Sequence, residues 1–319
     1  MARRGWGRGQ RCAVLAVVAA VLLGAGCSAD LDRARSLDTR VAGLDGVDDA
    51  DVRSATSDRA NLVRVTLDLG LDATETLAAV RRVDRQAREA GFTPYVLEVS
   101  RTITADDLLV VDDTFVGSRD ARRVVASWIR VTDAMLGEVT YEFGPGQEAI
   151  EVVSGGGIAH DVGEASRIGY GADDTTWRFR ADAAEFVTSG PVTRRDVTLF
   201  NRVQRSVAST VLPVPATYWE LHRRTGHVLL DLEVALDGGG SPERITLERR
   251  GPAIRPLAVA AVTSTRYPAT PRWVQLSDVT ATGRDTFASW SSETRPVRGR
   301  DRYSRGWDLW WVRVASSVR

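Results

Sequence analysis

The 319-residue sequence predicts an α+β fold, with two-layer sandwiches made from diverged α-β-β-α-β units and mainly antiparallel sheets. Three observations support this prediction. Hydrophobic residues make up 43% of the chain and charged residues 26%, which is ordinary for a globular protein and argues against a disordered or fibrous one. Segments with helical and strand periodicity alternate along the chain. A helix followed by two strands recurs at loose intervals of roughly 70 to 90 residues.

The first 26 residues predict an export signal. Four arginines precede an apolar stretch from Cys12 to Leu23, and small residues follow it up to Cys27. This segment resembles the signal of bacterial lipoproteins, in which small residues precede a cysteine that is acylated and becomes the new N-terminus. The resemblance implies a lipid such as palmitate on Cys27 and an anchor on the extracytoplasmic face of the cell membrane. Gly24 departs from the family, which prefers leucine there. Cleavage near Ala29, or an uncleaved helix of about eighteen residues, are the alternatives.

Cysteine and charge content restrict the possible functions. Cys12 and Cys27 are the two cysteines, so a chain cleaved before Cys27 can form no internal disulfide and no multi-cysteine zinc site. Every basic residue is arginine, which is typical of a GC-rich bacterial genome. Cleavage leaves 38 arginines against 42 acidic residues. The resulting negative charge argues against nucleic acid as a partner.

The first module is expected in residues 27–112. Its expected helices cover 31–44 and 74–90, and its expected strands cover 51–56, 62–70 and 92–100. This α-β-β-α-β order, from GVDDADVRS to PYVLEVS, resembles the BON-type modules of bacterial envelope proteins. The resemblance implies an interaction role in the envelope and brings no catalytic residue with it.

A second, degenerate module is expected in residues 113–188 and a third, with extra C-terminal strands, in residues 189–319. The second has an expected helix at 119–136 and strands at 139–143, 148–153 and 176–180, with room for only a short helix between the last two. The third has an expected helix at 192–209 and strands at 217–223 and 228–236. A further helix is expected to start at 241–243, to be interrupted by prolines and to resume around 257–263. The final expected strands cover 273–277, 286–291 and 307–314.

One strand carries a candidate pair for catalysis. Alternation places Glu220 and His222 on the same face, where they could transfer protons or bind a metal. An envelope hydrolase using this pair is therefore the alternative to a binding role. The structural alternative is a solvated ion-pair face, and no His-Glu-x-x-His spacing supports a zinc site.

Acidic and glycine-rich segments predict no cofactor. The aspartates at 45, 48, 49 and 51 and at 106, 107, 112 and 113 crowd what we expect to be two loops, but neither follows the calcium-loop pattern. The glycine triplets at 155–157 and 238–240 lack the lysine of a phosphate loop. No Gly-x-Ser-x-Gly motif is present. We therefore predict no metal and no catalytic residue.

The C-terminal tryptophans and arginines form a possible binding patch for glycans, a partner protein or anionic headgroups. Its residues are Trp307, Trp310, Trp311, Arg298, Arg300 and Arg302. Alternation makes both faces of the expected strand 307–314 apolar, so burial in the core is the alternative.

Together these features predict a membrane-anchored extracytoplasmic lipoprotein with a binding or scaffolding role in the cell envelope. The expected partners are the membrane, through the lipid, and an envelope protein or wall polymer. A solute-binding protein is a third possibility, which the short units argue against.

Overall fold

The computed structural model of the chain describes residues 27–57, 59–101, 104–236, 246–267, 270–280, 283–293 and 302–318. Its helices are α1 (Cys27–Ala42), α2 (Ala73–Glu89), α3 (Ala121–Ala134), α4 (Ile158–Ile168), α5 (Arg194–Val207), α6 (Leu247–Ser264) and α7 (Arg302–Ser316), with a short 3-10 helix, η1 (Phe115–Gly117). Its strands are β1 (Val47–Arg53), β2 (Asn61–Leu67), β3 (Tyr95–Arg101), β4 (Thr104–Asp112), β5 (Glu138–Gly144), β6 (Gln147–Val153), β7 (Thr175–Ala181), β8 (Ala184–Ser189), β9 (Tyr218–Arg224), β10 (His227–Val234), β11 (Arg272–Thr280) and β12 (Gly283–Ser291).

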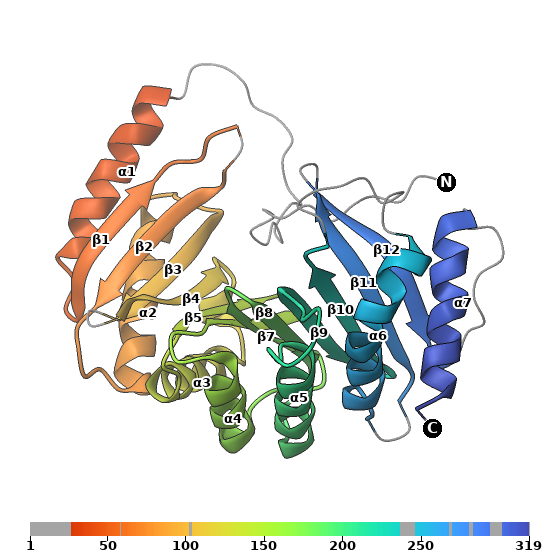
Figure 1. Cartoon of the computed structure of the whole chain (residues 1–319). Helices are drawn as coiled ribbons and strands as arrows, with labels where there is room; N and C mark the ends of the chain where they lie inside the picture. Colours follow the sequence, from red (N-terminus) through yellow and green to blue (C-terminus); the bar gives the residue numbers. More distant parts are fainter. Residues whose placement is uncertain are drawn as a thin grey trace.

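The described strands form one 12-stranded sheet whose spatial order is the order of the chain. Each of the helices α1 to α6 is followed by an antiparallel hairpin, and each hairpin pairs in parallel with the first strand of the next. The chain is thus a row of α-β-β units that ends with α7. In Figure 1 the helices lie along the outer side of a curved sheet, and each packs against its neighbours in sequence.

The predicted fold class, two-layer sandwiches with mainly antiparallel sheets, is wrong. The sheet is single and mixed, because parallel pairs β2–β3, β4–β5, β6–β7, β8–β9 and β10–β11 alternate with the antiparallel hairpins. The helix between two hairpins carries the chain back to the end of the sheet at which the preceding strand began. The next strand therefore runs parallel to that preceding strand. The pairs β4–β5 and β8–β9 also cross the expected module limits at 112/113 and 188/189.

The repeat is shorter than the sequence spacing indicates. The three helices expected to open the modules correspond to α1, α3 and α5, whereas α2, α4 and α6 open units of the same kind between them. Two strands that complete these units, β4 and β8, were not predicted. Five consecutive residues of the six in β8 are buried, so the strand lacks the alternation of buried and exposed side chains that predicts a strand.

The expected C-terminal strand over 307–314 is also wrong, since this segment lies in helix α7. Trp307, Trp311 and Val314 are fully buried, and their spacing of four and three residues fits one face of a helix. Leu309, which a strand would place beside them, is 46% exposed. Large apolar residues at short intervals fit both kinds of element, so only the tertiary contacts decide between them.

Strand alternation separates a helix-covered face from an open face. In β2, Val63, Val65 and Leu67 are buried under the helices, while Arg64 and Thr66 point to the other side. The side chains buried between the helices and the sheet form one continuous hydrophobic core, which extends from Ala34 to Val314. The helix-covered face therefore supplies the core, and the open face is mostly polar.

Candidate functional site

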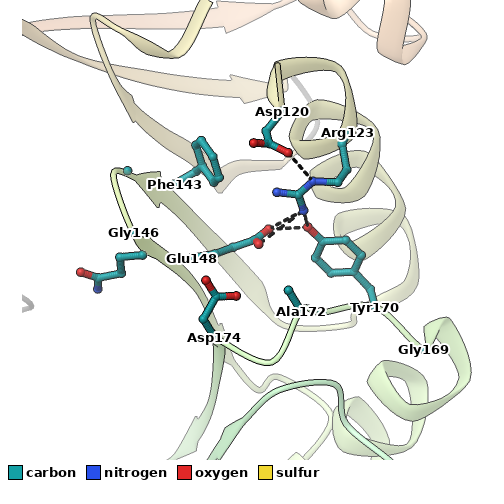
Figure 2. A pocket seen from close by; sticks show the side chains of 12 residues that line it. Asp120, Arg123, Phe143, Gly146, Glu148, Gly169, Tyr170, Ala172 and Asp174 are labelled. Atoms are coloured by element: carbon teal, nitrogen blue, oxygen red, sulfur yellow. Dashed lines mark hydrogen bonds and ion pairs between the residues drawn. The ribbon is translucent and has the colours of Figure 1, made fainter. Parts of the chain in front are cut away.

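A polar pocket of about 600 Å³ lies between two neighbouring α-β-β units. Its walls come from the start of α3, from the β5–β6 turn and from the loop between α4 and β7 (Figure 2). The volume falls within the range of about 300–1,000 Å³ that is usual for small-molecule sites. The lining residues are Asp120, Arg123, Phe143, Gly144, Gly146, Gln147, Glu148, Gly169, Tyr170, Gly171, Ala172 and Asp174.

A buried carboxylate organises the floor of the pocket. Glu148 is only 4% exposed, because it lies on the helix-covered face of β6 between the core positions of that strand. It accepts hydrogen bonds from Tyr141 Oη, Tyr170 Oη and Thr175 Oγ1, the last at 3.3 Å. Arg123 Nη1 donates to both carboxylate oxygens, at 3.2 and 3.4 Å. Four side chains thus satisfy a charge that would be costly to bury alone.

Arg123 is held in one orientation on the wall of the pocket. Its Nε donates to Asp120 Oδ1 at 3.1 Å, and its Nη1 also donates to Tyr170 Oη. The guanidinium carbon lies 5.9 Å from the centre of the Phe143 ring and 6.0 Å from that of Tyr170. Within the described part of the chain, Nη2 has no partner, and Figure 2 shows a free nitrogen directed toward Phe143 and the open space. The pocket therefore offers a fixed donor.

Burial and hydrogen bonding keep these groups in their ordinary protonation states. Burial alone would lower the pKa of Arg123, but the hydrogen bonds to Asp120 and Glu148 outweigh it and raise the pKa above the usual value. The pKa of Tyr141 is raised by burial and by its bond to Glu148. Burial and Glu148 likewise raise the pKa of Tyr170. Arg123 stays charged and both phenols keep their protons, so neither tyrosine is prepared to act as a base.

The loop after α4 places Tyr170 and Asp174. Gly169 ends the helix in the left-handed conformation, with φ of 63°, which glycine adopts without steric cost. The chain then turns so that the Tyr170 hydroxyl reaches Glu148. Asp174 is exposed and has no hydrogen bond or ion pair to any described residue, and its carboxylate is directed into the pocket in Figure 2. It supplies a free acceptor opposite the donor of Arg123.

These groups can bind a ligand but do not form a recognisable catalytic set. The wall contains acceptors on Asp120, Asp174 and Gln147, a free donor on Arg123, and two aromatic rings. Its residues include no Ser, Cys, Lys or His that could serve as nucleophile or base. The arrangement suits a small polar ligand with both hydroxyl donors and acceptors.

No protein-family model, curated protein or solved structure matches the chain. The lipoprotein and BON-type resemblances remain predictions, and the candidate site is supported by its geometry alone. Among the helices of the described part, none has the length and apolarity needed to cross a bilayer.

The expected pair Glu220 and His222 does lie on one face of β9, outside this pocket. Glu220 Oε2 and His222 Nε2 are 3.6 Å apart on the open face of the sheet. His222 Nδ1 is buried without a hydrogen-bond partner in the described residues. No group of three or more His, Cys, Asp or Glu side chains in that part of the chain is arranged to hold a metal ion. Neither residue lines the pocket described above.

The expected tryptophan patch is mostly in the core. Trp307 and Trp311 are 1% and 0% exposed, and Trp310 is half-buried against Trp307. They do not form an exposed platform. Arg298 and Arg300 lie outside the described residues, as does the side chain of Arg302.

The two acidic clusters lie largely in strands, not in loops. Asp48, Asp49 and Asp51 belong to β1, and the cluster near residue 110 belongs mainly to β4. Cys27, the expected lipidation site, lies in α1.

Sequence reasoning missed every residue of the pocket. The sequence does contain one indication of the pocket. Glu148 alternates in step with Ile150 and Val152, so it lies on the same buried face of the strand as they do. A charged residue at a core position indicates a buried partner. Tyr170 and Asp174 carry no such signal, since only the packing of adjacent units brings them to Glu148.

Proposed function

We propose that this protein is a lipid-anchored binding protein on the extracytoplasmic face of the cell envelope, and that the Arg123 pocket holds a saccharide unit of a wall polymer. The observation that carries the proposal is the pocket wall itself, where a fixed guanidinium, the free carboxylate of Asp174 and two aromatic rings converge. The role is binding, because the wall lacks a catalytic set.

A saccharide matches these groups better than a charged ligand does. Vicinal hydroxyls both donate and accept, so they can use the Asp174 carboxylate and the Arg123 guanidinium at once. The apolar face of a sugar ring packs on an aromatic ring such as Phe143. An anionic ligand would meet Asp120 and Asp174, whereas a cationic one would meet Arg123.

The anchor part of the proposal depends on the N-terminus. The expected signal ends directly before Cys27, and Cys27 lies in α1 of the first unit. A lipid on Cys27 would hold the first α-β-β unit at the membrane surface without a linker. The remaining units would then extend from that point toward the wall.

Titration with wall glycan tests the pocket. We would titrate the full chain, purified in nonionic detergent, with soluble saccharide fragments of peptidoglycan and record the heat of binding. We expect Asp174→Ala to weaken binding about tenfold, the effect of losing one hydrogen bond to a charged group.

Asp173→Ala is the matched control, because Asp173 is the exposed neighbour that does not line the pocket. It should leave the affinity unchanged. Absence of saccharide binding by the wild type, or equal losses in the two variants, would contradict the pocket assignment.

Mass and fractionation test the anchor. We expect wild-type protein in a GC-rich bacterial host to carry a diacylglyceryl mass on a chain that starts at Cys27, and to sediment with membranes. Cys27→Ala should lose that mass and either be released or accumulate as precursor. An unmodified wild-type chain that starts elsewhere would contradict the lipoprotein assignment and leave the pocket test unaffected.

A further inference from the structure

The helical layer of the molecule is strongly basic. Among its described side chains, the exposed arginines outnumber the exposed acids by seventeen to six. The exposed acids are Asp30, Asp32, Glu75, Glu89, Asp133 and Glu248. The exposed arginines are Arg33, Arg35, Arg40, Arg81, Arg85, Arg88, Arg122, Arg123, Arg130, Arg167, Arg194, Arg195, Arg205, Arg249, Arg255, Arg305 and Arg313.

Many of these arginines are not neutralised within the molecule. Arg81 and Arg85 on α2, Arg122 on α3, and Arg194 and Arg195 on α5 form no ion pair with any described residue. Asp196, the acid nearest to the last two, is fully buried and paired with Arg223. The basic charge of the layer is therefore available to a partner.

The open face of the sheet has the opposite charge. Regular strand pairing places eleven acids and five arginines on this face, and all but two of the acids, Glu185 and Glu233, are exposed or half-buried. The arginines are Arg53, Arg64, Arg178, Arg180 and Arg224. The acids are Asp49, Asp51, Glu98, Asp112, Glu138, Glu142, Glu151, Glu185, Glu220, Asp231 and Glu233.

Four of the five arginines of the open face already form ion pairs with acids of the same face. Arg64 pairs with Glu98 at 2.5 Å, and Arg180 pairs with Glu151 at 2.8 Å. In contrast, Glu138 and Glu142 on β5 have no ion pair within the described residues. The surplus on this face is therefore carboxylate, and it lies on the inner side of the curved sheet (Figure 1).

We propose that the basic helical layer of one molecule docks on the acidic open sheet face of a second copy of this chain. The two surfaces are complementary in charge, and the helices form the outer side of the curve whose inner side is acidic. Because the two surfaces differ, the contact is heterologous, and a dimer leaves one helical layer and one sheet face free for further copies. The association therefore continues beyond a dimer. It depends neither on the saccharide pocket nor on the lipid.

Self-association of the full chain in nonionic detergent tests this proposal. We would measure the mass by light scattering over a range of protein concentrations, at about 50 mM and about 500 mM NaCl. We expect multiples of the monomer mass that grow with concentration, and an association constant at least about tenfold lower at high salt.

Charge reversal identifies the surfaces. One variant carries Glu138→Arg and Glu142→Arg, and the other carries Arg194→Glu and Arg195→Glu, where new acids suit the first turn of α5. Each alone should be monomeric at low salt, and a mixture of the two should associate, since each reversed surface then meets its complement. Asp182→Arg, in the exposed β7–β8 turn, should associate like the wild type.

Circular dichroism would confirm that each variant is folded, and the corresponding Gln variants replace any that is not. A monomeric wild type at low salt overturns the proposal and leaves the acidic face to some other basic partner. The proposal is also overturned if both charge-reversed variants associate as strongly as the wild type, or if the two variants fail to associate when they are mixed.

Discussion

At the scale of single residues, three buried carboxylates share one chemistry. Each accepts hydrogen bonds from an arginine and a tyrosine, and in two of the three sets the tyrosine comes from the next unit. The sets are Asp84 with Arg88 and Tyr95, Glu148 with Arg123 and Tyr170, and Asp196 with Arg223 and Tyr267. A bidentate or tightly fixed arginine suits such sites because its donors are rigid. Of the three, the Glu148 set opens onto the pocket.

We expect Glu148→Gln to lower the free energy of unfolding by about 2 kcal/mol, because charge-assisted hydrogen bonds from Arg123 and two tyrosines weaken together. Chemical denaturation measures the change. Glu151→Gln is the matched control on the same strand, where a half-exposed arginine is the partner, and it should cost under about 1 kcal/mol. Equal losses of unfolding free energy in the two variants would mean that the buried network stabilises the fold no more than the exposed ion pair does.

Glu142→Gln should stabilise the protein at neutral pH only. Burial raises the pKa of Glu142, and the nearby Glu151 carboxylate raises it further. The folded state therefore holds this proton more tightly than the unfolded chain, so ionisation above the raised pKa destabilises the fold. Because the group is partly exposed, we expect a gain of only about 0.5 kcal/mol at pH 7.

The gain should vanish near pH 3, well below the ordinary pKa of glutamate, where the side chain is protonated in both states. Thermal unfolding at the two pH values measures it. Glu138→Gln, exposed on the same face of β5, serves as control and should change stability less at pH 7. A gain that is the same at both pH values would contradict the electrostatic cause.

At the scale of elements, periodicity predicts most helices and hairpins but not how they join. The helix expected at 74–90 is α2 (Ala73–Glu89), and the strands expected at 139–143 and 148–153 are β5 and β6. Their apolar residues recur at regular intervals, which is a local property. Parallel pairing across a helix is not local, so the single sheet could not be read from these patterns. The pocket depends on that pairing and was missed with it.

Helix α7 shows why an apolar segment is ambiguous, and two substitutions distinguish the alternatives. In a strand, Leu309 and Trp311 would share a face, whereas in α7 one is half-exposed and the other fully buried. We expect Trp311→Ala to cost about 3–5 kcal/mol and Leu309→Ala under about 1 kcal/mol. Denaturation curves provide the comparison, and similar costs would favour the strand.

At the scale of the whole molecule, the units contact mainly their neighbours in sequence. The strongest helix contacts join consecutive helices, and the sheet order repeats the chain order. The stability of such an array is close to a sum of units and their interfaces. A destabilising substitution at one end of the sheet should therefore lower the local stability near that end only.

Hydrogen exchange on Trp311→Ala tests this expectation. We expect faster exchange in α7, β11 and β12, and unchanged protection in α2 and β3, which lie many strands away. Leu309→Ala should leave all of these segments as in the wild type. A uniform loss of protection over the sheet would mean that the array unfolds as one cooperative unit.

The chain-ordered sheet also sets the sequence of folding events. Every strand pairs with the strand immediately before or after it, so no pairing waits for a distant segment to be synthesised. A chain that emerges with its N-terminus first can add each hairpin to an edge that is already formed. The outer edge of β1 stays unpaired throughout that process, whereas the growing edge moves toward the C-terminus as each unit is completed.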